Sequence, residues 1–154
     1  MKNTLALILT LAATPLFAND ISVEDAFARA SRPGAPTGAM FMTIHNAGDA
    51  SDRLISAASP VAKLVELHTH IEEGGVMKMR QVEGGFEIPA GGMHALARGG
   101  DHVMLMGLTQ SLENGDTVPL TLIFENAGEM ALEVTVDNDR EQGQHGMQHG
   151  KKNN

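Results

Sequence analysis

Residues 67–80 read LHTHIEEGGVMKMR, and this stretch predicts a β-hairpin. Two histidines alternate with other residues before the segment EEGG, and two methionines alternate after it. Successive strand residues point to opposite faces of a sheet, so each pair shares one face. A four-residue EEGG loop places His68 opposite Met79 and His70 opposite Met77, with opposed Cβ atoms about 4.5–5.5 Å apart. The hairpin therefore gathers nitrogen and thioether donors on one face.

The stretch DHVMLMGL repeats the pattern in a second expected strand. His102, Met104 and Met106 share one face, and Val103 and Leu105 share the opposite, core-type face. For any one of these residues the ordinary interpretation is packing or solvation, since methionine commonly fills gaps in cores. Packing alone gives no reason for the His and Met alternation to occur twice. The repetition favours a metal site.

The rest of the chain has the pattern of an all-β domain. Short apolar runs are separated by Gly, Pro, Asn and Asp at intervals of about ten residues, which is typical of a sandwich or barrel. We expect a Greek-key arrangement without long helices. The expected strands cover 21–30, 39–46, 53–58, 62–71, 76–82, 102–108, 120–125 and 130–136.

The two ends of the chain differ from this domain. Residues 1–18 carry one positive charge and then an apolar run ending at Ala18, as in a secretory signal peptide too short to span a membrane. The alternative is a buried N-terminal helix. Residues 139–154 contain almost no apolar side chains, so we expect a disordered tail. These boundaries leave 19–138 as one exported β domain, without a membrane span.

Composition excludes several function classes. The formal net charge of −8 argues against nucleic acid and anionic lipid as partners. The absence of cysteine removes the thiolate that a blue-copper centre needs. The absence of Trp and Tyr counts against a carbohydrate-binding sandwich, and we find no H-E-x-x-H, G-x-S-x-G or phosphate-loop motif.

The available donors point to a soft monovalent ion. Thioether sulfur favours Cu(I), whereas imidazole suits Cu, Zn and Ni alike. Zinc more usually recruits cysteine or carboxylate ligands. A copper cargo site is the interpretation we prefer. The alternative is a copper or zinc β-barrel oxidoreductase of the superoxide dismutase type, which would need further histidines and an aspartate in its metal shell.

The spacing of these donors resembles the periplasmic copper chaperone family of the PCuAC type, whose signature is H-x10-M-x21-H-x-M. His68, Met79, His102 and Met104 match it, with 22 residues instead of 21 in the second spacer. The flanks GVMKMR, EIPAGG, HVMLMGL and GAMFMTIHNAG also resemble the family. The resemblance covers the domain and implies a cupredoxin-like Greek-key β-barrel. It further implies a non-enzymatic, periplasmic carrier that binds Cu(I) through these four residues.

By the same resemblance, the carrier hands copper to a periplasmic copper-relay protein or to the copper subunit of a respiratory oxidase. Other donors lie outside the signature. His70, Met77 and Met106 share the proposed metal faces and could be additional ligands. In the tail, His145, Met147 and His149 form a flexible segment suited to Cu(II), or a terminus without a role.

The remaining residues near the site have simpler interpretations. We expect Met40 and Met42 in the core, His45 on the surface, and Met93 and His94 in a loop that could approach the site. Glu66, Glu72 and Glu73 are expected to form a solvated face.

Overall fold

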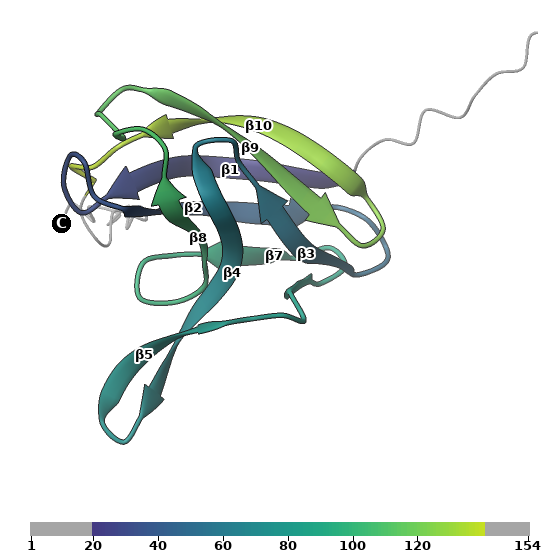
Figure 1. Ribbon diagram of the computed structural model, residues 1–154. Coiled ribbons are helices and arrows are strands. Elements are labelled where there is room, and N and C mark those ends of the chain that lie inside the picture. Colours follow the sequence, from purple (N-terminus) through teal and green to yellow (C-terminus); the bar gives the residue numbers. More distant parts are fainter. Residues whose placement is uncertain (1–19, 141–154) are drawn as a thin grey trace, which may run out of the picture.

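The computed structural model describes residues 20–140, and their regular structure consists of strands (Figure 1). The all-β prediction is therefore confirmed. The strands are β1 (Ile21–Ala30), β2 (Thr37–Asn46), β3 (Asp52–Ala58), β4 (Ala62–Glu73), β5 (Val76–Gln81), β6 (Phe86–Ile88), β7 (Met93–Leu96), β8 (His102–Leu108), β9 (Thr117–Phe124) and β10 (Gly128–Val136). Eight correspond to expected strands. The two additional strands, β6 and β7, have only three and four residues, too few for an alternation pattern to be recognised.

The strands form one sheet in the order β5-β4-β8-β2-β1-β10-β9-β3-β6, with β7 paired to β2. Most neighbours are antiparallel, but β1 and β10 run parallel. Strands far apart in the sequence are thus brought together, as β8 lies between β4 and β2. The hydrogen-bonded order does not close into a ring: β5 and β6 form its two ends. The sheet curls around one core, and β3 also lies close to β4, which is not its hydrogen-bonded neighbour.

Alternation along the strands explains how the sheet encloses this core. In β8, Val103 and Leu105 are fully buried, as expected for the aliphatic face. Leu67 of β4 and Met40 and Met42 of β2 are also buried, so the core prediction for the two methionines is confirmed. The histidines of β4 and β8, together with Met104 and Met106 of β8, lie on the opposite face.

The β4–β5 hairpin has a shorter turn than the sequence analysis expected. Its turn is Gly74–Gly75, both with positive φ (62° and 79°), and the strands extend to residues 73 and 76. A type I′ hairpin turn needs positive φ at both of its central positions, which glycine adopts without strain. His70 therefore pairs with Met79, and His68 with Gln81, so the predicted His68–Met79 and His70–Met77 pairings are wrong. The shift is two positions, so all these donors keep their predicted face.

The outer part of this hairpin leaves the body of the domain (Figure 1). All residues from 71 to 81 are exposed, including Val76, Met77 and Met79, of which each has about half of its surface accessible.

Among residues 20–140, no helix is long and apolar enough to cross a membrane.

Candidate metal centre

The candidate donors are brought together by the order of three neighbouring strands. β4 lies between β5 and β8, so its outward face has donors on both sides. His68 pairs directly with His102 of β8, and His70 pairs directly with Met79 of β5. Met104 pairs with Glu66, which places it diagonally from His68. The predicted residues Met79, His102 and Met104 therefore surround His68 on one face of the sheet.

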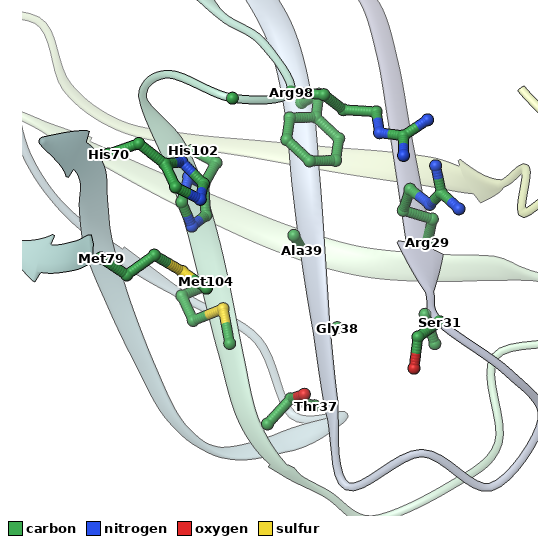
Figure 2. A pocket seen from close by; sticks show the side chains of 13 residues that line it. Arg29, Ser31, Thr37, Gly38, Ala39, His70, Met79, Arg98, His102 and Met104 are labelled. Atoms are coloured by element: carbon green, nitrogen blue, oxygen red, sulfur yellow. The ribbon is translucent and has the colours of Figure 1, made fainter. Parts of the chain in front are cut away.

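A cleft of about 390 Å³ opens beside these strands (Figure 2). Its wall includes Met79, His102 and Met104, three of the four residues that match the sequence signature, together with His70. His68 does not line this cleft, but its ring lies 5.9 Å from the His102 ring, measured between centroids. The His70 and His102 rings are 5.2 Å apart. Imidazole and thioether groups thus share one small region of the surface.

The carbonyl of Gly100 orients two of the imidazoles. It lies 2.9 Å from Nδ1 of His102 and 3.2 Å from Nδ1 of His70. A carbonyl oxygen can only accept, so both rings carry their proton on Nδ1. In the neutral ring, the lone pair of Nε2 is then available to a metal ion.

His102 is the most enclosed of the three histidines, with 2% of its surface exposed. Burial lowers the pKa of His102, the Gly100 carbonyl opposes this shift, and the nearby His70 and His68 rings lower the pKa further. A metal ligand must be a neutral imidazole, so this environment favours the form of His102 that binds metal.

A carboxylate orients His68 in the opposite sense. Oε2 of Glu66 lies 2.8 Å from Nε2 of His68, and both side chains are largely buried. Since the carboxylate accepts, the proton is on Nε2 and the lone pair is on Nδ1. Nδ1 of His68 is buried without a hydrogen-bond partner in the described part of the chain. The expectation that Glu66 belongs to a solvated face is wrong, because its carboxylate holds this ring.

The Glu66 contact could have been found from the sequence. Residues two apart on a strand share a face, and a carboxylate beside a histidine is a frequent partner of the ring N–H in metal sites. Glu72 and Glu73 are exposed as expected, and Glu73 pairs with Lys78 and Arg80.

The remaining candidates lie away from the cleft. Met77 pairs with Glu72 near the exposed hairpin tip. His45 is half-buried at the surface and contacts Glu24 at 3.1 Å. The expected loop at Met93 and His94 is wrong, because both belong to β7.

The β7 strand directs its two donors differently. Met93 is exposed, whereas Nε2 of His94 lies 2.8 Å from Oδ2 of Asp101 and its ring stacks on Phe86 at 5.1 Å. Met106, between Leu64 and Thr37 in the sheet, does not line the cleft. His145, Met147 and His149 lie outside the described residues.

The donor set is neutral and soft. Among residues 20–140, no group of three or more His, Cys, Asp or Glu side chains is placed to hold a metal ion. A zinc site or a superoxide dismutase shell needs such a group, so the oxidoreductase alternative is not favoured. Thioether sulfur from Met79 and Met104 is available beside these imidazoles, and thioether sulfur favours Cu(I).

Comparisons with known sequences place the domain among named relatives. The family model "Putative lipoprotein LpqE-like" matches residues 21–136. A protein of Leifsonia xyli subsp. xyli, whose name also reads "Putative lipoprotein", is 34% identical over 119 residues. The match covers 77% of this chain and 70% of the relative. An uncharacterised protein of Rickettsia prowazekii is 30% identical over 101 residues, covering 66% of this chain and 56% of that protein.

Solved structures with a similar fold include copper-bound proteins. The copper-bound PCuAC domain of PmoF2 matches with a TM-score of 0.64 and 26% identity, covering 77% of this chain and 93% of that domain. The solution structure of Cu(I)-bound DR1885 from Deinococcus radiodurans matches with a TM-score of 0.62 and 36% identity, covering 80% of this chain and 84% of that chain.

Proposed function

This chain belongs to the LpqE-like family, a PCuAC-type family with a cupredoxin-like fold, and from this premise we propose that it is a copper chaperone. It binds Cu(I) as cargo in an exported domain and delivers it to the copper centre of a respiratory oxidase. The PCuAC domain of PmoF2 and DR1885, both similar in structure, have each been solved with copper bound.

The proposed ligands are His68, Met79, His102 and Met104. Their strand positions support this set, because His68 lies directly opposite His102 and diagonally from both methionines. Diagonal neighbours in a sheet are about 7–8 Å apart, within reach of long side chains. The observation that carries the proposal is the buried Nδ1 lone pair of His68, which has no hydrogen-bond partner among residues 20–140 and whose ring is held by Glu66. A bound cation would satisfy this lone pair.

The same geometry supports release of the metal. His102 and Met104 belong to a strand inside the sheet, whereas Met79 is 49% exposed on the edge strand of the hairpin. A receiving protein can approach Met79 first and replace it by a ligand of its own. Neutral ligands hold Cu(I) without the strong charge attraction of a thiolate, so stepwise exchange remains possible.

His70 is the strongest competitor for a place in the ligand set. It pairs with Met79 and lines the cleft, and Gly100 fixes its tautomer. Gln substitutions of His68 and His70, made separately, distinguish the two assignments. We expect His68→Gln to weaken Cu(I) at least tenfold in anaerobic competition with a chelator, and His70→Gln to weaken it less. If His70→Gln weakened Cu(I) binding more than His68→Gln, the proposed ligand would be His70 and not His68, and the proposed chaperone function would be unchanged.

The thioether ligands have a matched control. Met79→Ala should weaken Cu(I) far more than Cu(II), because only the soft ion gains much from thioether sulfur. Met77→Ala changes a methionine on the same strand and face with similar exposure, and it should leave Cu(I) binding unchanged. Equal effects of the two substitutions would remove Met79 from the site.

Export and delivery need their own measurements. Intact mass of protein recovered from the periplasm should show a chain beginning at Asn19. The Cu(I)-loaded protein should then metallate a soluble oxidase copper domain faster than an equal amount of chelated Cu(I). A rate no greater than that of the chelated ion would leave copper binding in place but contradict oxidase delivery.

The tail is a second copper-binding candidate. His145 and His149 offer imidazoles without a fixed thioether partner, a donor set that suits Cu(II), which binds most tightly among the divalent first-row metals. We propose that this segment captures Cu(II) separately from the Cu(I) centre.

A further inference from the structure

The cleft beside the candidate metal centre has a second, positively charged side. Arg29 of β1 pairs with Ala39 of β2, and Ala39 pairs with Met104 of β8. Arg29 and Arg98 both line the cleft, and their guanidinium groups lie beyond Ala39 as seen from Met104 (Figure 2). Two strand spacings of about 4.8 Å put the Arg29 backbone about 10 Å from that of Met104. One small cleft therefore joins the soft donors to two arginines.

Arg29 is incompletely satisfied in this position. Its Nη1 is buried and has no hydrogen-bond partner in the part of the chain that the structure describes. Burial lowers the pKa of Arg29 and the neighbouring charge of Arg98 lowers it further, while Asp137 opposes both. An unpaired buried donor destabilises the folded protein, and a charged donor does so more strongly. A partner that accepts hydrogen bonds from Arg29 would remove this penalty.

We propose that this cleft binds a carboxylate between Arg29 and Arg98. The planar guanidinium presents two parallel N–H donors, which match the two oxygens of a carboxylate. Because Nη1 of Arg29 is buried, the terminal group has to rotate for this nitrogen to reach the ligand. The hydroxyl groups of Ser31 and Thr37 line the same cleft and can bind further ligand oxygens.

The floor of the cleft leaves room for such a ligand. Between Arg29 and Met104 it consists of Ala39 and the backbone of Gly38. The side chain of Ala39 is only a methyl group, so it leaves the space between the two sides of the cleft open.

The net negative charge of the chain confines anion binding to this cleft. The chain has a formal net charge of −8, which repels anions in general, so binding at this cleft has to come from the two arginines. The carboxylate can be that of a small free acid or of an acidic side chain on a docking protein. Both use the same guanidinium chemistry, and their separate binding can be measured.

Copper-free full-length protein provides the test. Titration with succinate, and separately with a capped peptide containing one glutamate, is followed by calorimetry and by the 15N-detected NMR signals of the arginine side chains at constant ionic strength. We expect saturable 1:1 binding of at least one probe, weakened tenfold or more by Arg29→Gln. Succinate binding identifies a free acid as a sufficient ligand, and binding of the peptide alone identifies a protein side chain.

Arg53→Gln is the matched control, because it removes the same charge from a partly exposed arginine paired with Glu87 and Glu125. It should not change carboxylate binding. If Arg29→Gln lowers the unfolding midpoint, Arg98→Gln provides a second variant with the same expected loss. The proposal is overturned if neither probe binds, if sulfate binds as well as the carboxylates, or if Arg53→Gln has the effect of Arg29→Gln. Each result is independent of copper, so failure of this site leaves the chaperone proposal standing.

Discussion

Glu66 and His68 form a hydrogen bond of 2.8 Å between Oε2 and Nε2, with side chains only 21% and 13% exposed. The two residues lie two positions apart on β4, so they share the face that also carries the candidate metal donors. The carboxylate fixes both the rotation and the tautomer of the ring. Its effect on a metal at Nδ1 is therefore indirect, through the position and basicity of the imidazole.

Removing this carboxylate should weaken metal binding without removing a ligand. We expect Glu66→Ala to lower Cu(I) affinity about 10–100-fold, the usual effect of losing a partner of a metal-bound histidine. Glu72→Ala is the control, because Glu72 lies on the same strand and face but is exposed. Chelator competition measures both. Equal affinities for the two variants would show that the Glu66 contact has no part in the site.

The two-glycine turn should control the position of Met79. Alanine at Gly75 must adopt φ near +79°, which costs about 1–2 kcal/mol for a residue with a Cβ. We expect Gly75→Ala to speed amide hydrogen exchange in β4 and β5 near the turn and to weaken Cu(I) binding. Gly84→Ala is the control, because no atom lies within 4 Å of the added Cβ and its φ is ordinary. Unchanged amide hydrogen exchange in Gly75→Ala would show that the turn does not set the position of Met79.

Burial of His102 predicts a stability that depends on pH. Its folded pKa is lower than its unfolded pKa of about 6.5, so the unfolded chain binds the proton first as pH falls. Stability from this residue should decrease below about pH 6.5, by at most about 1.4 kcal/mol per pH unit. We expect His102→Phe to reduce this slope in urea unfolding of copper-free protein between pH 7.5 and 5.5. His45→Gln should retain it, and an unchanged slope in His102→Phe would contradict the assignment.

Asp52 should make the stability of the fold depend on pH in the acid range. Burial opposes its ionisation, but backbone N–H groups of Asn126, Arg53 and Ala127 hold the pKa of Asp52 below its ordinary value. A depressed pKa stabilises the fold above the unfolded value of about 3.9, and this contribution is lost as pH falls through the folded pKa. Asp52→Ala should cost about 1–3 kcal/mol at pH 7 and much less at pH 2.5, measured by urea unfolding. Asp49→Ala, at an exposed position, should cost little at either pH.

The sequence could predict what depends on local alternation. β8 has the predicted bounds, and Val103 and Leu105 are in the core because a period of two fixes the face of every residue in a strand. The hairpin register could not be derived, because a two-residue turn and a four-residue turn keep His68 and Met79 on the same face. Only the pairing differs between them.

The charged side of the cleft also could not be predicted. Arg29 and Met104 are 75 positions apart, and their proximity depends on β2 lying between β1 and β8. Nothing in the local sequence around Arg29 specifies that order of strands. The same limit applies to Gly100, whose carbonyl serves two histidines because a turn before β8 carries it to the end of β4.

Two residues beyond Asn138 contact the folded domain. Asp139 and Arg140, which the sequence analysis assigned to the tail, contact the domain: Asp139 accepts a hydrogen bond from Asn114 at 2.6 Å, and Arg140 pairs with Asp25 at 2.9 Å. The Arg140 guanidinium also lies 4.3 Å from the centre of the Phe27 ring. We therefore compare a chain ending at residue 140 with one ending at residue 138.

Both truncations should reduce Cu(II) binding, because both remove the two tail imidazoles, and both should leave the Cu(I) stoichiometry at one. Only the shorter chain should be destabilised, by about 1–2 kcal/mol, since it alone loses the exposed ion pair and the cation–π contact. Metal titrations and thermal unfolding of the two proteins decide these points. Loss of Cu(I) from the chain ending at residue 140 would place tail residues in the Cu(I) site, and unchanged Cu(II) binding would leave the tail without a copper-binding role.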